Sequence, residues 1–315
     1  MASYLSRRLA VAVLVLFLLS FLVFAMVRLM PGDPAAQYLN SSNPDPTQLA
    51  QIRHQLGLDR GWIQQYFSWI GGVLTGDFGT SLTRPFAIGG QIGSRLPASL
   101  ELAVVASILA IVMGVPAGVW AAARTGKAAD VSLRGLSFLA LSVPGFVIGT
   151  VVVLVNSHTL RLNLIGYTPF LSDPLQSLGQ IFVPSLVLSL SMAGILCRYT
   201  RNMVIDVLSQ DFVRTARAKG ASTWQLIRKH AVRSSMVPVT TVIGLQLGAL
   251  VGGTIIVENI FAIPGMGSML IEALNSSDYP TIQACVLMLG VVYIVINLVV
   301  DLLYPLIDPR IRTVR

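Results

Sequence analysis

Charged residues are scarce in this chain of 315 residues. Asp, Glu, Lys and Arg together make up 11% of the sequence, whereas hydrophobic residues make up 54%. A water-soluble globular domain carries charge on about a quarter of its residues. The composition therefore excludes that class of protein and predicts a polytopic membrane protein.

Reactive side chains are equally few. The two cysteines, Cys197 and Cys285, fall in apolar stretches, and the three histidines, His54, His158 and His230, are far apart in the sequence. This distribution offers no disulfide framework, no set of metal ligands and no nucleophile with a neighbouring base. We therefore predict no catalytic residues and no metal site, and we expect both cysteines to be buried as small apolar side chains.

A phosphate-binding loop is also missing. The motif G-x-x-x-x-G-K-[ST] needs a lysine followed by Ser or Thr, and none of Lys127, Lys219 and Lys229 has that neighbour. The apolar stretches also lack the carboxylates at mid-depth that proton-coupled carriers commonly use. If the chain moves a solute uphill, a partner must supply the energy; otherwise the chain is a passive channel.

What the sequence does contain is a series of long apolar runs. A helix needs about 20 residues to cross the hydrocarbon core of a membrane. The runs are continuous rather than alternating, which excludes membrane-spanning strands. The fold class is therefore an all-α polytopic membrane protein with about six transmembrane helices, at roughly 9–28, 98–122, 133–156, 181–200, 237–261 and 283–305.

The basic residues predict how the chain is oriented. If the amino terminus is cytoplasmic, 16 of the 22 Lys and Arg residues lie in cytoplasmic segments. Five of the other six lie in 28–97, which is longer than the loops that the positive-inside rule governs. Both termini are therefore expected in the cytoplasm, and the net charge of +8 reflects topology rather than nucleic-acid binding.

The external segment is expected to contain short helices. A chain break is predicted at Pro31–Pro34, a helix from Asp45 to Leu56, and an aromatic helix from Trp62 to Leu74. The aromatic helix suits the membrane interface, with contact to an external protein as the alternative. Three parts follow: an N-terminal transmembrane helix at 1–30, the extracytoplasmic segment at 31–97, and a five-helix core at 98–315.

Polar residues in or near the spans are candidates for a translocation path, because a polar group in lipid is costly unless it is solvated or paired. The four candidates are Glu101, Asn156, Glu258 and Asn259. Glu101 lies one turn inside the outer end of its span, so packing or solvation at the interface is the alternative role for this residue.

Glycines at intervals of four mark one face of the fifth span. Gly244, Gly248 and Gly252 form two overlapping G-x-x-x-G units, which allow another helix to approach the backbone closely. The partner helix belongs either to this chain or to a second, similar chain.

The most basic segment lies between the fourth and fifth spans, at 205–238. Apolar residues at spacings of three to four predict one amphipathic helix from Ile205 to Gly220, with Phe212 on its apolar face. Gly220 suits a helix end, and Ser222 with Gln225 forms a capping box that starts a second helix at 222–235. Such a corner is either held by a partner protein or lies on the membrane surface.

The sequence of this corner, FVRTARAKGASTWQLIRKHAVRSSMVPV, resembles the EAA loop of the permease subunits of binding-protein-dependent ABC importers, in the form of the dipeptide and oligopeptide branch. Further matching stretches are RRLAVAVLVLFLLSFLVFAMVRLMPGDPA, GDFGTSL, RLPASLELA, VENIFAIPGMGSMLIEALNSSDYPTIQ and DLLYPLIDPRIR. The resemblance covers nearly the whole chain and implies the type I importer permease fold, with the cytoplasmic coupling helix in the EAA loop at 205–238.

The resemblance also implies which residues contact the ATPase. They are Asp211, Arg214, Thr215, Ala216, Arg217 and Gly220. Arg214 and Thr215 stand where the general signature has Glu and its first Ala, as in the peptide branch, while Ala216 and Gly220 fit the signature. Whether Asp211 or Arg214 makes the main polar contact stays open.

The resemblance implies a complex in the bacterial inner membrane. Its parts are this chain, a second related permease, two ATPase subunits or domains that bind ATP and Mg²⁺, and an extracytoplasmic substrate-binding protein, with no cofactor in this chain. The implied cargo is a dipeptide or oligopeptide, and nickel, glutathione or haem on the same machine are the alternatives. A passive channel remains the alternative from another functional class.

Overall fold

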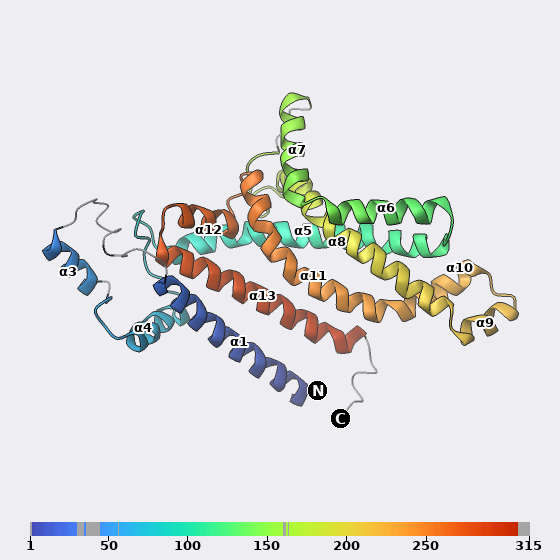
Figure 1. The fold of residues 1–315 in the computed structure, drawn as a ribbon, viewed down its shortest axis with the longest axis horizontal. Coiled ribbons are helices and arrows are strands. Elements are labelled where there is room, and N and C mark those ends of the chain that lie inside the picture. The colour runs from blue at the N-terminus through green and yellow to red at the C-terminus, as the bar shows by residue number, and fades with distance from the viewer. Residues whose placement is uncertain are drawn as a thin grey trace. The chain divides into compact units, whose positions relative to one another are not determined.

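The computed structural model describes residues 2–29, 35, 45–55, 57–159, 162 and 164–307, and most of these residues are helical. Within these ranges the only β-type pairing is an isolated bridge between Thr80 and Ala87. The all-α fold predicted from the continuous apolar runs is confirmed. The helices (Figure 1) are α1 (Ala2–Leu29), α3 (Pro46–Gln55), α4 (Trp62–Leu74), α5 (Ile88–Ala123), α6 (Ala128–Ser142), α7 (Gly145–His158), α8 (Pro174–Leu208), α9 (Asp211–Ala218), α10 (Thr223–Leu226), the π-helix η1 (Ile227–Ala231), α11 (Val232–Ile260), α12 (Met266–Asn275) and α13 (Tyr279–Ile307).

Five continuous helical stretches are long and apolar enough to cross a membrane: Ser6–Leu29, Ile88–Ala123, Pro174–Leu208, Thr223–Ile260 and Tyr279–Leu302. The sixth predicted span, at 133–156, is broken, because α6 and α7 meet at an angle of 92°. The break falls at Pro144, which lacks a backbone N–H and holds the preceding Val143 in an extended conformation with ψ 117°.

The chain forms two compact units. One unit contains Leu100–Ile263 and the residues from Val295 onward, and the other contains Ala2–Ser99 and Pro264–Ile294. We call them the core unit and the outer unit. The three-part division at 1–30, 31–97 and 98–315 stays a prediction, and the predicted break at Pro31–Pro34 lies outside the described residues.

In the core unit, α5 lies against α8 at the distance of backbone contact. A Cβ atom on Gly114 would lie 2.6 Å from the carbonyl oxygen of Ala193, and one on Gly118 would lie 2.5 Å from that of Cys197. Neither position has room for a side chain. On another side of α8, Gly194 faces α6, where an added Cβ would lie 3.0 Å from the Ser137 carbonyl oxygen. Small residues therefore set the spacing of all three helices.

The glycines of α11 do not form one continuous stripe. An added Cβ on Gly244 would lie 2.3 Å from Val300 of α13, and Gly248 is buried. Gly252 is exposed, with no atom within 4 Å of the position of its Cβ, and Gly253 instead meets Leu188 of α8. Four residues advance about 40° beyond a full helical turn, so a repeat of four drifts around the helix and leaves the packed face after two steps.

In the outer unit, α4 packs on α1 through Tyr66. The ring of Tyr66 meets Phe21 and Phe24 edge-on, and its hydroxyl lies 2.8 Å from the Ser20 hydroxyl. This arrangement leaves the other face of α4 exposed. A separate apolar core joins the start of α5 to α12 and α13 through Ile88, Ile92, Met266, Met269, Ala284 and Cys285.

The contact between α5 and α8 can be tested with one methyl group. Replacing Gly118 with Ala places a carbon against a carbonyl oxygen and should lower the free energy of unfolding by about 1–3 kcal/mol, measured by thermal denaturation in detergent. Gly135 of α6 has no atom within 4 Å of its Cβ position, so Gly135→Ala is the matched control and should have no destabilising effect. Equal losses from the two variants would contradict this packing.

Candidate functional site

The basic segment between α8 and α11 begins with a break that the periodicity did not predict. Helix α8 continues to Leu208, Gln210 is extended with φ −73° and ψ 151°, and α9 starts anew at Asp211. The prediction of one helix from Ile205 to Gly220 is therefore wrong. The apolar residues at 204–208 complete the packing of α8, and the Ser209 hydroxyl donates to the carbonyl of Asp206 at 2.7 Å, which caps the helix end.

The new start of α9 changes which of its residues face inward. Val213 is 1% exposed, whereas Phe212, expected on the apolar face, is 45% exposed. Ala216 is half-buried, three residues after Val213. The sequence pattern placed Phe212 on the buried face, whereas Val213, the next residue, is buried there. The error arose because the prediction continued the periodicity of 205–208 across the break at Ser209 and Gln210.

The predicted turn at Gly220 is confirmed. Gly220 has φ +90°, a backbone conformation that L side chains rarely adopt. The Ser222 N–H donates to Gln225 Oε1 at 2.9 Å, and the Gln225 N–H donates to Ser222 Oγ at 3.4 Å, which forms the predicted capping box. The helix that follows does not end at 235. It runs through η1 into α11 as one stretch, Thr223–Ile260.

The segment from Ser209 to Ala231, which we call the corner, is anchored at a few apolar positions. Leu226, Ile227 and Ala231 are buried, and Ala231 belongs to an apolar cluster that also contains Ala122 of α5 and Val204 and Val207 of α8. The cluster joins the corner to the adjacent ends of α5 and α8, and the corner itself continues into α11. Displacement of the corner would therefore act on these helices directly.

A buried ion pair braces the same end of the core unit. Arg201 of α8 donates from Nε to Asp130 Oδ1 at 2.6 Å and from a terminal nitrogen to Oδ2 at 2.9 Å. The Gly126 N–H also donates to Asp130, at 3.0 Å, and the side chain of Asp130 is 1% exposed. Sequence reasoning missed this pair, because the two residues are 71 positions apart and both fit the general pattern of cytoplasmic charge.

The outward side of the corner is polar and basic. The side chains of Asp211 and Arg214 are 97% and 75% exposed and form a weak ion pair at 3.6 Å. Thr215 donates to the Asp211 carbonyl at 3.1 Å. Two aromatic side chains are also exposed, Phe212 and Trp224. The exposed basic residues of the corner are Arg214, Arg217, Lys219, Arg228 and Lys229.

Two of the path candidates have definite partners. Glu101 accepts hydrogen bonds from the Tyr167 hydroxyl at 2.8 Å and from the Ser177 hydroxyl. Burial and the bond to Glu101 both raise the pKa of Tyr167, so this phenol stays protonated. Asn156 donates to the Leu162 carbonyl and accepts from the Leu162 N–H, both at 2.9 Å. Both residues therefore hold the loop that follows α7.

The other two path candidates lie near the end of α11. Glu258 is fully buried, and its carbonyl accepts from the Ile263 N–H at 2.8 Å. Asn259 is exposed and donates to the carbonyl of Ile255, one turn back, at 2.9 Å. A role of these four residues in a translocation path stays a prediction.

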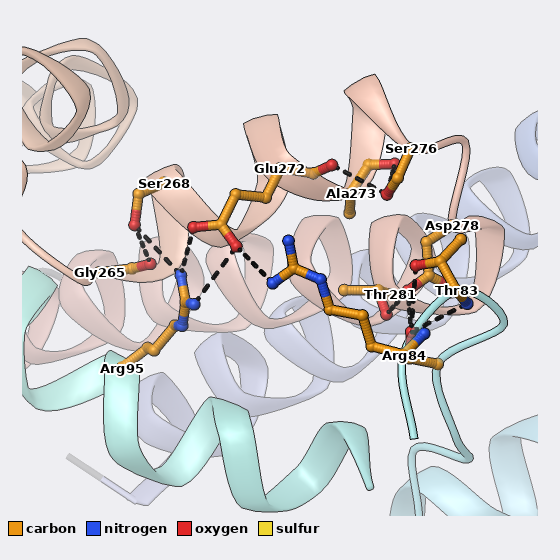
Figure 2. Close-up of polar contacts among 11 residues, drawn as sticks. Thr83, Arg84, Arg95, Gly265, Ser268, Glu272, Ala273, Ser276, Asp278 and Thr281 are labelled. Atoms are coloured by element: carbon orange, nitrogen blue, oxygen red, sulfur yellow. Dashed lines mark hydrogen bonds and ion pairs between the residues drawn. The ribbon is translucent and has the colours of Figure 1, made fainter. Parts of the chain in front are cut away.

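The outer unit contains a polar network that sequence reasoning also missed (Figure 2). Arg95 and Arg84 both bond to Glu272 of α12, at 3.1 Å and 3.3 Å. Asp278 accepts from the Ser81 hydroxyl at 2.5 Å and from the Thr281 hydroxyl at 2.7 Å. The network fastens the loop before α5 to the turn between α12 and α13.

Comparison with known proteins finds matches along nearly the whole chain. Residues 114–313 match the family model described as binding-protein-dependent transport system inner membrane component, and residues 1–103 match the model of the N-terminal region of such components. The first match contains the corner.

Curated relatives cover this chain from end to end. The chain is 36% identical over 313 residues to a putative peptide transport system permease protein of Brucella abortus, with 99% of each chain covered. It is 37% identical over 312 residues to the glutathione transport system permease protein of Escherichia coli K12, again with 99% of each covered.

A solved structure shares the fold. A chain of the MetNI methionine ABC transporter in an inward-facing conformation matches with a TM-score of 0.55 and 17% sequence identity, and the match covers 69% of this chain and 96% of that one. At this identity the likeness shows the fold alone, which is that of an ABC transporter permease.

The buried ion pair predicts unequal effects of two substitutions. Asp130→Ala leaves the Arg201 guanidinium, whose side chain is only 14% exposed, without its carboxylate partner and should lower the free energy of unfolding by about 3–5 kcal/mol. Arg134 is the control: it also contacts Asp130, at 3.6 Å, but its side chain is 48% exposed. Arg134→Ala should therefore cost less than about 1 kcal/mol in the same denaturation experiment. Similar losses would show that Asp130 is not held mainly by Arg201.

Proposed function

We propose a function for this chain on the premise that it belongs to the family of binding-protein-dependent transport system inner membrane components. It is a permease subunit of an ABC importer in a bacterial inner membrane, and in our proposal it carries dipeptides or oligopeptides into the cell. The single observation that carries the proposal is the corner, which is exposed on its polar side and packed on its other side against the long helices of the core unit.

In the proposal, other subunits supply the energy for transport. No lysine here is followed by Ser or Thr, so the chain has no phosphate-binding loop of the G-x-x-x-x-G-K-[ST] type. In the proposal, two separate ATPase subunits or domains bind ATP and Mg²⁺ and grip the corner. Asp211, Arg214, Thr215, Ala216, Arg217 and Gly220 form the contact region, and exposed Phe212 and Trp224 extend it.

The basic face favours an acidic receiving surface on the ATPase. The corner exposes five basic side chains, and Asp211 already contacts one of them, Arg214. Charge complementarity of this kind guides encounter and fixes the register of docking. Of the two residues proposed for the main polar contact, Arg214 therefore suits an acidic partner and Asp211 positions Arg214.

Transport follows from how the corner is anchored. When the ATPase pair closes on ATP, it displaces the corner, and the cluster around Ala231 passes the movement to α5, α8 and α11. The continuous helical stretch Thr223–Ile260 moves as one unit, so the start of this stretch in the corner and its membrane-spanning part move together. The helices then alternate between inward-open and outward-open arrangements around a path completed by a second permease, which receives cargo from a substrate-binding protein outside.

The distribution of basic residues supports a cytoplasmic position for the corner. Both termini and the corner are cytoplasmic in the proposal, where the ATPases are, because the basic residues concentrate in these segments. The outer unit would then meet the substrate-binding protein.

Glutathione is the second candidate cargo. The relative with 37% identity is a glutathione permease, and glutathione is itself a small peptide. Both cargoes share an amide backbone and a carboxylate, so a single path could accept either. The substrate-binding protein selects between them in this proposal.

The turn at Gly220 provides the test. Gly220→Val puts a β-branched side chain at φ +90°, so the corner must refold locally and lose its docking shape. We expect uptake of labelled dipeptide or glutathione into cells to be abolished, while the chain still inserts in the membrane and no longer captures the ATPase through a carboxy-terminal tag. Gly220→Asn is the matched control and should retain most uptake, because Asn tolerates positive φ.

Normal uptake by Gly220→Val would contradict the coupling role of the corner. Conduction of solute by the purified wild-type chain without any ATPase would instead favour the passive channel.

A further inference from the structure

Apart from Arg7 and Arg8 near the amino terminus, the arginines of the outer unit fall into two groups. Arg84 and Arg95 pair with Glu272 in the network of Figure 2. The other three, Arg28, Arg53 and Arg60, line a single cavity of about 710 Å³. Arg28 contacts the ring of Phe24 at 5.2 Å, and neither Arg28 nor Arg60 has an ion pair among the described residues. The only acidic residue among the described lining residues is Asp77, so the described lining carries net positive charge.

Two buried amides in the same cavity have unused hydrogen-bonding atoms. Gln65 is 9% exposed, and its nitrogen donates to the carbonyls of Leu58 and Arg60 at 3.2 Å and 2.7 Å, but its Oε1 has no partner. Gln283 is 7% exposed, and its Nε2 has no partner. A buried amide group without a partner is costly. A ligand that both donates and accepts hydrogen bonds would satisfy both atoms.

The cavity adjoins a surface suited to lipid chains. Tyr66 and Gln65 face inward from α4, while Ile63, Phe67 and Leu74 are 76%, 63% and 82% exposed. These three residues lie on one side of α4, at spacings of four and seven. Helix α4 packs against the carboxy-terminal half of the membrane helix α1 through Tyr66. The apolar face of α4 therefore lies at the depth of the membrane interface, next to the arginines of the cavity.

We infer that this cavity binds the phosphate-bearing headgroup of an anionic phospholipid, with its acyl chains along the exposed face of α4. Arg28 and Arg60 bind the phosphate through charge-assisted hydrogen bonds. Gln283 donates to a phosphate oxygen, and Gln65 accepts from a hydroxyl of a glycerol headgroup. Trp69, which also lines the cavity, is a residue typical of the membrane interface. The assignment to the outer leaflet rests on the proposed topology, whereas the site itself does not.

Lipid retention tests the inference without any transport assay. The complex carrying the full chain is purified in mild detergent, and bound lipids are counted by native mass spectrometry after delipidation and addition of phosphatidylglycerol or phosphatidylethanolamine. The wild-type chain should retain phosphatidylglycerol in preference to phosphatidylethanolamine. In the double variant Arg28→Gln with Arg60→Gln, its affinity should fall by at least about tenfold, because each lost charge-assisted bond is worth a factor of that order.

The control is Arg84→Gln, an arginine of the same unit that lies outside the cavity and should leave retention unchanged. Gln65→Leu is a second test: without changing charge it removes the unused acceptor, together with the hydrogen bonds from Nε2 to the Leu58 and Arg60 carbonyls, and it should reduce the preference for the glycerol headgroup. Equal retention of the two lipids, or retention unaffected by the double variant, would overturn the inference. Displacement of the lipid by millimolar inorganic phosphate would also overturn it, by showing that the site takes a soluble anion.

Discussion

Backbone contact between α5 and α8 is the interaction on which the core unit depends. In lipid, apolar side chains gain little by leaving their surroundings for one another, so helices associate where small residues let their backbones approach. Gly114 and Gly118 of α5 meet the carbonyls of Ala193 and Cys197, and Gly194 gives α8 a similar surface toward α6. The ends of these helices are thereby held close enough for Arg201 to reach Asp130. The ion pair in turn fixes the loop that joins α5 to α6.

The packing of α5, α6 and α8 also holds the corner in place. Its buried residues pack on helix ends that are already fixed, while its polar face stays free for a partner. The break at Ser209 and Gln210 separates α9 from α8, so the two helices do not form one continuous helix. On the other side no such break exists, because η1 continues into α11. A force on the corner would therefore act mainly through the stretch Thr223–Ile260.

The sequence predicted those features that local chemistry determines. Long apolar runs indicated the membrane helices, and Gly220 and Ser222 indicated the turn and the cap. Residue periodicity gave the wrong helix boundaries where a tertiary contact determines where a helix ends. The residues at 204–208 followed the same apolar pattern as α9, but they pack with Ala122 and end α8 instead. The partners of Asp130 and Asp278 could not be predicted, because 71 and 197 residues separate them from Arg201 and Ser81.

The central claim is that the corner touches an ATPase, and cross-linking from Arg214 tests it most directly. Both native cysteines, Cys197 and Cys285, are buried, so Arg214→Cys introduces the accessible thiol. A photoreactive group attached there in native membranes should form an ATP-sensitive adduct with a subunit that contains a phosphate-binding loop. The same group at Leu136, an exposed apolar position of α6, should form none. Adducts of Arg214→Cys with lipid alone, in membranes that import the cargo, would contradict the account.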